Sequence, residues 1–174
     1  MNGMENINTF LKETLLRAGA DLVGYGDMQE LPPDVRCDLP RGISVAVKYP
    51  KEVIRGIVNL PTKEYYDYYN LLNVELDMLV TLGAKTLQER GYQAIPQTLD
   101  YIKSFEHNYH TPLPHKTVAT RAGLGWIGKN ALLITNEFGS MVRISSIITD
   151  APLEVENPVN ISKCGECTAC TRQY

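Results

Sequence analysis

Residues 131–149 read ALLITNEFGSMVRISSIIT, and they indicate the fold class more clearly than any other part of the chain. Both ends of this stretch, Ala131–Thr135 and Met141–Thr149, are rich in aliphatic and β-branched residues, which favour β-strands. The five residues between them include asparagine and glycine, which are typical of tight connections. The two strands are therefore predicted to pair with each other as an antiparallel hairpin.

Three segments outside this stretch have helical periodicity. The longest runs from Pro61 to Arg90, with Thr62 as its N-terminal cap and Gly91 as its end. Shorter helices are predicted at Ile7–Ala18 and His115–Ala122. In the long helix, small and apolar residues recur at steps of three and four and predict a buried stripe: Leu72, Leu76, Leu79, Gly83 and Leu87.

The remaining segments read as short strands and connections. Strands are predicted at Asp21–Gly26, Ile43–Val47 and Tyr92–Ile95, whereas Leu99–Pro114 is predicted as a long loop of the kind that often carries function. Directly paired strands interspersed with helices favour an α+β fold, in which helices pack on a mostly antiparallel or mixed sheet. We expect one domain over residues 1–160, which ends in a linker at Ala151–Lys163.

The composition restricts the classes of function. The chain has 174 residues, 44 % of them hydrophobic and 21 % charged, as in an ordinary globular domain. Its net charge of −3 provides no general attraction to nucleic-acid phosphates. No apolar stretch approaches the roughly 20 residues of a membrane helix, and the N-terminus lacks the features of a signal peptide. We therefore expect a cytoplasmic protein without a membrane partner.

Three cysteines near the C-terminus, Cys164, Cys167 and Cys170, follow the spacing C-x2-C-x2-C. The bacterial ferredoxin signature, C-x2-C-x2-C-x3-C, holds 4Fe–4S clusters, and here its fourth position is Tyr174. Residues 161–174 are therefore expected to be the start of a ferredoxin-like module, truncated or degenerate. The fourth ligand of the first cluster would come from a second cysteine run, which this chain lacks. We expect that the chain alone does not hold a stable four-iron cluster.

Other interpretations of the cysteines are open. Zinc takes three thiolates with one further cysteine or histidine, but the three histidines lie far upstream. The cysteines also need not bind any metal. A disulfide framework is disfavoured, because Cys37 is the only other cysteine and an unpaired set of thiols suits a reducing compartment.

The segment from Arg121 to Asn130, RAGLGWIGKN, is a second motif. Its glycines let the backbone approach a neighbour closely, either a flat cofactor or the rest of a tight turn that seats the only tryptophan. It is not a dinucleotide fingerprint, because it follows a helix and precedes a strand. We expect it to line a cofactor cleft, so that Gly125→Val removes cofactor binding and leaves the fold intact. The predicted cofactor-binding residues are Gly123, Gly125, Trp126, Gly128, Lys129 and Asn130.

These motifs together resemble the epoxyqueuosine reductase family. The segment at 121–130 is followed by LLIT at 132–135, FGS at 138–140, TDAPL at 149–153 and then the cysteine run, in the family's order and spacing. The resemblance is strong over roughly residues 92–170. It implies a cobalamin-binding domain, related to reductive dehalogenases and to flavin nitroreductases, followed by a 4Fe–4S module that delivers electrons to the cobalt. The family's namesake reduces a modified nucleoside in tRNA.

The family's proton-donating aspartate is absent. Its position falls on Tyr109, so Tyr109, His110 and His115 are the candidate catalytic residues, since histidine titrates near neutral pH. For each of them an ordinary loop or helix-cap side chain is the alternative, since histidine is also common on protein surfaces. Without the aspartate, efficient reduction of epoxyqueuosine in tRNA is not expected, and a small molecule or modified nucleoside is favoured over tRNA.

The sequence thus predicts an oxidoreductase, an iron–sulfur and cobalamin-dependent reductase with an unidentified substrate and a protein electron donor. Two other classes are open. One is a non-catalytic electron-transfer or cofactor-binding module, and the other is a flavin-dependent reductase.

Overall fold

The computed structural model describes residues 6–105 and 111–172 of the chain, so Tyr109, His110 and Tyr174 lie outside the described residues. The helices are α1 (Ile7–Arg17), α2 (Lys51–Arg55), α3 (Lys63–Gln88), α4 (Leu99–Ser104) and α5 (His115–Arg121). The strands are β1 (Leu22–Asp27), β2 (Arg41–Lys48), β3 (Ala94–Pro96), β4 (Gly125–Ile127), β5 (Leu133–Thr135) and β6 (Val142–Thr149).

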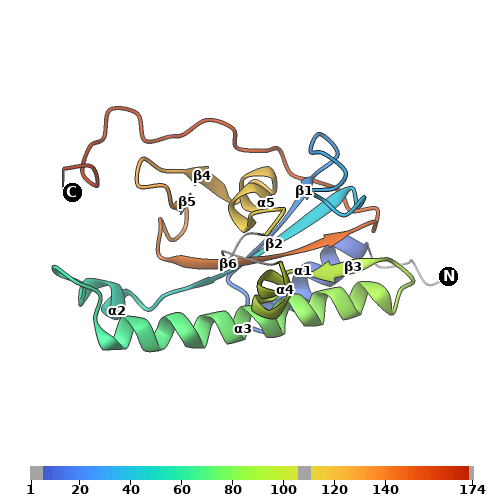
Figure 1. Cartoon of the computed structure of the whole chain (residues 1–174), viewed down its shortest axis with the longest axis horizontal. Helices are drawn as coiled ribbons and strands as arrows, with labels where there is room; N and C mark the ends of the chain where they lie inside the picture. The colour runs from blue at the N-terminus through green and yellow to red at the C-terminus, as the bar shows by residue number, and fades with distance from the viewer. Residues whose placement is uncertain (1–5, 106–110, 173–174) are drawn as a thin grey trace.

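Four of the strands form one sheet in the order β1-β2-β6-β3, and each neighbouring pair is antiparallel. Helices α1 and α3 pack on one face of this sheet, while α5 and the small β4–β5 ribbon lie on the other (Figure 1). The expected α+β fold, with helices on an antiparallel sheet, is confirmed. None of the helices in the described part of the chain combines the length and hydropathy needed to cross a membrane.

The predicted hairpin between Ala131–Thr135 and Met141–Thr149 is wrong. Strand β5 pairs instead with β4, while β6 is bordered by β2 on one edge and β3 on the other. The connection folds back on itself, because Thr135 and Gly139 exchange backbone hydrogen bonds and Gly139 has a φ of +58°. Strand β5 lies outside the sheet and pairs with the glycine segment, whereas β3 occupies the second edge of β6 only at Ile147–Thr149.

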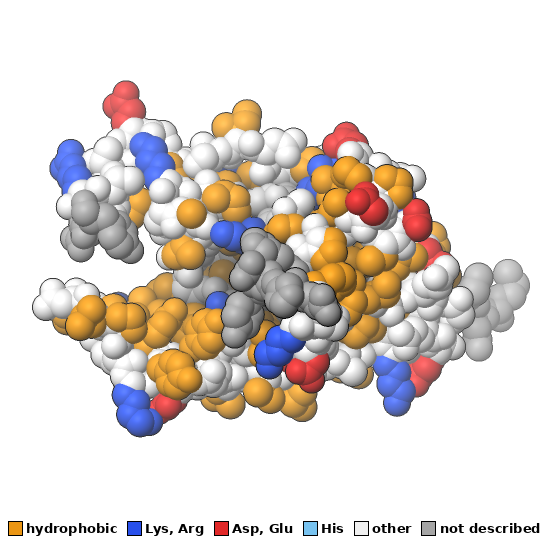
Figure 2. Space-filling model, in the orientation of Figure 1, with side chains coloured by type: hydrophobic (Ala, Val, Ile, Leu, Met, Phe, Trp, Pro, Cys, Tyr) orange, Lys and Arg blue, Asp and Glu red, His pale blue; other side chains and the backbone are white. Residues whose placement is uncertain are grey.

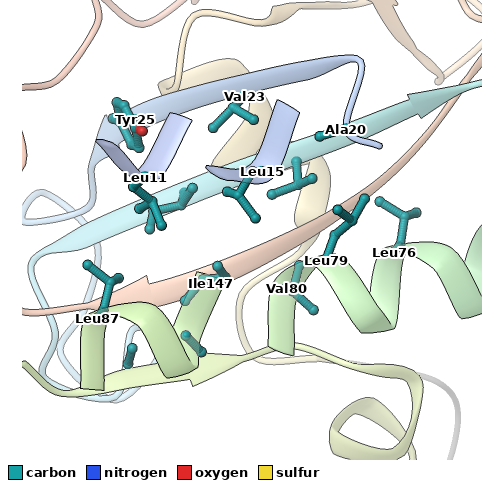
Figure 3. Packing of buried hydrophobic residues seen from close by; sticks show 14 of the residues in the cluster. Leu11, Leu15, Ala20, Val23, Tyr25, Leu76, Leu79, Val80, Leu87 and Ile147 are labelled. Atoms are coloured by element: carbon teal, nitrogen blue, oxygen red, sulfur yellow. The ribbon is translucent and has the colours of Figure 1, made fainter. Parts of the chain in front are cut away.

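Helix α3 follows the sequence closely. Thr62 caps it by accepting a hydrogen bond from the Tyr65 backbone N–H at 3.1 Å, and Gly91, with a φ of +88°, redirects the chain after its end. All five residues of the predicted stripe are buried. Figure 3 shows the side chains of Leu76, Leu79, Val80 and Leu87 directed toward α1 and the sheet, where Leu11, Leu15 and Ile147 complete the core.

Two short helices depart from the sequence prediction. Helix α4 lies inside the predicted loop at Leu99–Pro114, and Thr98 caps it by accepting from the Tyr101 backbone N–H at 3.2 Å. Helix α2 has only five residues and follows Pro50. Neither helix is long enough to carry an amphipathic repeat, so periodicity does not detect them.

The linker after β6 runs back across the α5 side of the molecule (Figure 1). Glu156 attaches it to β1 twice, because its backbone N–H donates to the Tyr25 carbonyl at 2.9 Å and its carboxylate accepts from the Tyr25 N–H at 2.6 Å. Further along, the Val159 N–H donates to the Thr120 carbonyl at 2.8 Å. These contacts bring the cysteine run to the end of the molecule that carries β4 and β5.

Replacing Leu87 by alanine tests the packing of α3. Leu87 is fully buried, so the substitution should lower the free energy of unfolding by about 2–5 kcal/mol through lost contacts and the cavity left behind. Met78→Ala on the same helix is the control, because Met78 is 69 % exposed and should change stability by less than about 1 kcal/mol. Urea denaturation measures both, and equal losses would contradict this packing.

Candidate functional site

A cavity of about 380 Å³ lies between the start of α5, strand β5 and the first half of β6. This volume is within the usual range for small-molecule sites. The surface is hollowed between a lower lobe with α2 and the start of α3 and an upper lobe with β4, β5 and the cysteine run (Figure 2). The residues that line the cavity are Ile102, Thr111, Pro114, His115, Lys116, Leu132, Leu133, Ser140, Val142, Arg143 and Ile144.

A smaller cavity of about 180 Å³ shares several of these walls, among them His115 and Arg143. Asn73 and Asp77 of α3 contribute to it from the opposite side. Asp77 accepts a hydrogen bond from the Leu99 backbone N–H at 3.0 Å, and burial raises the pKa of its carboxyl group above the usual range. Polar groups from α3, α5 and β6 therefore meet here.

His115 is the first residue of α5, and its Nδ1 lies 2.7 Å from the Ser146 hydroxyl. Ser146 is fully buried in β6 and also hydrogen-bonds the side-chain oxygen of Gln97. Gln97 in turn donates from its side-chain nitrogen to the Leu113 carbonyl at 3.1 Å and to Thr111 Oγ1 at 2.8 Å. A chain of hydrogen bonds thus connects a backbone carbonyl to the imidazole.

The order of donors and acceptors along these hydrogen bonds defines the tautomer of His115. A backbone carbonyl only accepts, so the nitrogen of Gln97 faces Leu113 and its oxygen faces Ser146. The Ser146 hydroxyl must donate its one proton to that oxygen, and it therefore accepts from His115. His115 carries its proton on Nδ1, and in the neutral ring Nε2 is left as a hydrogen-bond acceptor.

Electrostatics keeps this imidazole neutral. Burial, together with the nearby Arg143 guanidinium, lowers the pKa of His115 to about 4. At neutral pH Nε2 therefore carries no proton to donate. This geometry favours a role for His115 as an acceptor over the role as proton donor that the sequence suggested.

Arg143 brings a positive charge to the same cavities. Its Nε and Nη2 donate to the Asn73 side-chain oxygen at 3.1 and 2.6 Å, and its guanidinium stacks over the Tyr69 ring at 4.2 Å. Among residues 6–105 and 111–172, Arg143 has no ion pair with a carboxylate. The half-buried charge is thus positioned without being neutralised by a described neighbour.

The glycine segment makes its close contacts with β5. A β-carbon at Gly125 would lie 2.0 Å from the Ile134 carbonyl oxygen, and one at Gly128 would lie 2.9 Å from an Ile134 side-chain carbon. The expectation that Gly125→Val would leave the fold intact is therefore wrong, because the larger side chain would break the β4–β5 pairing. None of residues 123–130 is among the residues that line the described cavity, so their binding of a cofactor stays a prediction.

Lys129 of this segment holds the cysteine run. Its ammonium donates to the Gly165 and Cys167 carbonyl oxygens, each at 2.8 Å. Trp126 adds a second contact, since the Lys163 ammonium lies 5.3 Å from the centre of its ring. The two sequence motifs are thus in direct contact. Asn130 has a local role, because its side-chain oxygen accepts from the Leu132 N–H at 3.2 Å.

The cysteine run offers thiol groups, which are suitable ligands for a metal centre. The Ser162 hydroxyl, with the backbone and charge of Lys129, lowers the pKa of the Cys164 thiol, and thiolates are the ligands of iron–sulfur clusters. In the described part of the chain, no three Cys, His, Asp or Glu side chains are already gathered around one point. The proposed ligand set therefore depends on the spacing of the cysteines.

Several residues of the site were not predicted from the sequence, namely Tyr69, Asn73, Gln97, Arg143 and Ser146. One signal was available, because Arg143 and Ser146 are polar residues within the otherwise apolar run of β6. A charged or hydroxyl side chain in a strand covered on both faces needs a polar partner. The identity of that partner depends on the fold and cannot be read from spacing.

Curated relatives with sequence similarity are epoxyqueuosine reductases. That of Listeria monocytogenes is 30 % identical over 178 residues, which cover 94 % of this chain and 44 % of the relative. That of Aliivibrio fischeri is 28 % identical over 155 residues, covering 84 % of this chain and 38 % of the relative. The chain thus spans about two fifths of the length of these relatives. No family model matches the chain.

Solved structures show the same fold. The epoxyqueuosine reductase of Streptococcus thermophilus superimposes with a TM-score of 0.65 and 22 % identity, covering 97 % of this chain and 52 % of that one. A catabolic reductive dehalogenase in complex with 3-bromo-4-hydroxybenzoic acid gives a TM-score of 0.71 at 17 % identity, covering 94 % of this chain and 24 % of that one.

The fold is therefore the one shared by epoxyqueuosine reductases and reductive dehalogenases. The resemblance to epoxyqueuosine reductases that the sequence predicted is confirmed in both sequence and fold.

The His115 tautomer can be measured directly. Long-range ¹H–¹⁵N correlation spectra at pH 7 should show a protonated Nδ1 and an unprotonated Nε2, because Ser146 accepts from His115. Ser146→Ala removes this acceptor and should shift the population toward the other tautomer. A protonated Nε2 in the unmodified protein would contradict the hydrogen-bond chain.

The lowered pKa of His115 also predicts a pH dependence of stability. Between pH 6.5 and about 4 the unfolded chain binds a proton at this residue that the folded chain excludes, so the free energy of unfolding falls as the pH falls. Between pH 7 and 5 the loss should be about 1–2 kcal/mol. Urea denaturation of His115→Phe should show a pH dependence that is smaller by this amount. An unchanged pH dependence would mean that His115 titrates normally.

Lys129→Met should loosen the cysteine run. The substitution removes two charge-assisted hydrogen bonds at an exposed site, so backbone amides between Cys164 and Thr171 should exchange with solvent about fivefold faster. Lys85→Met, at another exposed lysine, is the control and should leave these amides unchanged. Equal exchange in both variants would show that Lys129 does not hold the run.

Proposed function

We propose that the chain is the cofactor-binding part of a cobalamin- and iron–sulfur-dependent reductase that acts on a small molecule. The observation that carries this proposal is the contact of Lys129 with the carbonyl groups of the cysteine run. Through this contact an electron-carrying centre on the cysteines would be held against the β4–β5 ribbon. Leu132, just before β5, and Leu133, its first residue, line the cavity. The β4–β5 ribbon therefore connects the cavity with the cysteine run.

Cysteines 164, 167 and 170 would hold the cluster, which supplies single electrons when bound. Lys129 and Lys163 would offset part of its negative charge from the domain side. The three described thiolates are one short of the usual four, so a ligand from outside the run completes the set.

The surface hollow fits a large and partly apolar cofactor. Hydrophobic side chains face it along the lower lobe in Figure 2, and Val58 and Leu60, in the connection between α2 and α3, are 82 % and 77 % exposed. Exposed apolar surface of this kind marks binding sites. A corrin bound here would supply the redox-active metal. A solved reductive dehalogenase of the same fold, whose structure suggests a mechanism for B12-dependent dehalogenation, supports this.

The substrate remains a separate question. One solved relative is an epoxyqueuosine reductase with a modified tRNA stem loop, and another is a dehalogenase with a brominated hydroxybenzoic acid. This chain has a tyrosine at the family's aspartate position and a net charge of −3, so we favour the small molecule over tRNA.

Binding of the cofactor can be tested by visible absorbance and calorimetry with hydroxocobalamin and, separately, with flavin mononucleotide. We expect hydroxocobalamin to bind with a changed corrin spectrum and the flavin not to bind. Flavin binding alone would support a flavin-dependent reductase, and binding of neither would support a non-catalytic module. Either result would overturn the proposal.

The cluster ligands can be tested by anaerobic reconstitution with iron and sulfide in the presence of 2-mercaptoethanol, which can supply the missing thiolate. We expect cluster absorbance in the unmodified chain and in Cys37→Ser, and its loss in Cys167→Ser. Cys37 is the matched control, because it lies outside the run and its thiol contacts Tyr101 at 3.6 Å. Equal absorbance in both variants would exclude the run as the cluster site.

A further inference from the structure

Two groups at the cavity are open to a ligand: one hydrogen-bond acceptor and one cation without a described carboxylate partner. One is Nε2 of His115, which the chain of hydrogen bonds through Ser146 and Gln97 leaves as an acceptor. The other is the guanidinium of Arg143, which forms no ion pair with a carboxylate in the described part of the chain. Both residues line the larger and the smaller cavity.

The acceptor at His115 is rigidly defined. Ser146 and Gln97 are 0 % and 1 % exposed, so water does not compete for their hydrogen bonds. Gln97 is further fixed by its backbone, which donates to the Ser146 carbonyl at 2.9 Å and accepts from the Ser145 hydroxyl at 3.1 Å. A ligand group at His115 Nε2 must therefore bring a hydrogen-bond donor.

The guanidinium of Arg143 favours a hydrogen-bond acceptor that carries a negative charge. Asn73 takes two of its N–H donors and Tyr69 covers one face of the guanidinium, which holds it in place and leaves its charge uncompensated. A half-buried arginine of this kind binds an anionic oxygen well. Lys116 adds a second positive charge at the larger cavity, whereas the carboxyl group of Asp77 lines only the smaller one.

The remaining walls are hydrophobic. Ile102, Leu132, Leu133, Val142 and Ile144 surround the larger cavity, and they suit an apolar body such as a phenyl ring. The site thus combines a hydrophobic wall with one acceptor and one cation at its polar end.

We propose that this cavity binds a small organic acid that also carries a hydroxyl or N–H group. Its carboxylate contacts Arg143, its donor contacts His115 Nε2, and its apolar body lies against Leu132, Leu133 and Ile144. The existence of this binding site is inferred from the geometry of these residues alone. Its role as the substrate site depends on the proposed reductase function.

Matched pairs of aromatic acids test the proposal by calorimetry on the full chain without added cofactor. The probes are phenylacetate, mandelate, which adds an α-hydroxyl group, and 3-hydroxyphenylacetate, which adds a ring hydroxyl group. At least one hydroxylated acid should bind about threefold to tenfold more tightly than phenylacetate, the gain expected from one additional hydrogen bond. Failure of all three acids to bind, or equal affinity for all three, would overturn the proposal.

Two variants test the separate contributions of His115 and Arg143 to the affinity for these acids. His115→Phe keeps an aromatic ring but removes the acceptor, so the hydroxylated acids and phenylacetate should bind equally. Arg143→Gln should weaken all the acids by about tenfold or more, because a charge-assisted contact is lost. Arg17→Gln removes an exposed arginine on α1 and is the control, which should bind like the unmodified chain. Circular dichroism confirms that each variant is folded.

The two residue assignments can fail separately. If the hydroxyl preference persists in His115→Phe, the acceptor role is wrong. If Arg143→Gln binds the acids like Arg17→Gln, the role of the cation is wrong. Because these measurements use no cofactor, they are independent of the hydroxocobalamin experiment. Acid binding without cobalamin binding would refute the proposed cobalamin-dependent function and leave this site in place.

Discussion

Strand β6 is the constraint on which the rest of the structure depends. It pairs with β2 along its whole length and with β3 at Ile147–Thr149, so its register is fixed and successive side chains point to opposite faces. Ile147 packs in the core under α1 and α3, whereas Ile148 packs in the second cluster with Val118 of α5. The same alternation directs Arg143 to α3 and Ser146 to α5. A slip of one residue would exchange all four side chains.

The polar end of the cavity follows from this register. Ser146 meets the imidazole at the start of α5, and Gln97, directly after β3, joins it because β3 borders β6. On the other face, Asn73 of α3 reaches Arg143. Since β5 leaves the sheet to pair with β4, space remains over the first half of β6, and the cavity lies there. The same small ribbon contacts the cysteine run through Lys129, so the cavity and the run are held by one structural unit.

Much of the fold could be predicted from the sequence, and the reasons are local. The stripe of α3, its Thr62 cap and its end at Gly91 all depend on residues close together in the chain. The strand pairing could not be predicted in the same way. Two neighbouring strands with a short connection suggest a hairpin, but the partner of β5 is the glycine segment at Gly125–Ile127, which the local pattern does not reveal. His115 could be selected from its chemistry, whereas its tautomer depends on Gln97 and Leu113, which only the fold brings together. Tyr109 and His110 lie outside the described residues, so their catalytic role stays a prediction.

The central claim is that one site, framed by β6 and the β4–β5 ribbon, serves both a cofactor and a small acid. A crystal structure of the chain grown with hydroxocobalamin and mandelate tests this claim most directly. The account predicts a corrin in the hollow between the α2–α3 lobe and the β4–β5 lobe, and a carboxylate in contact with Arg143 while a hydroxyl donates to His115. A corrin bound on another face, or an acid that contacts neither Arg143 nor His115, would contradict it.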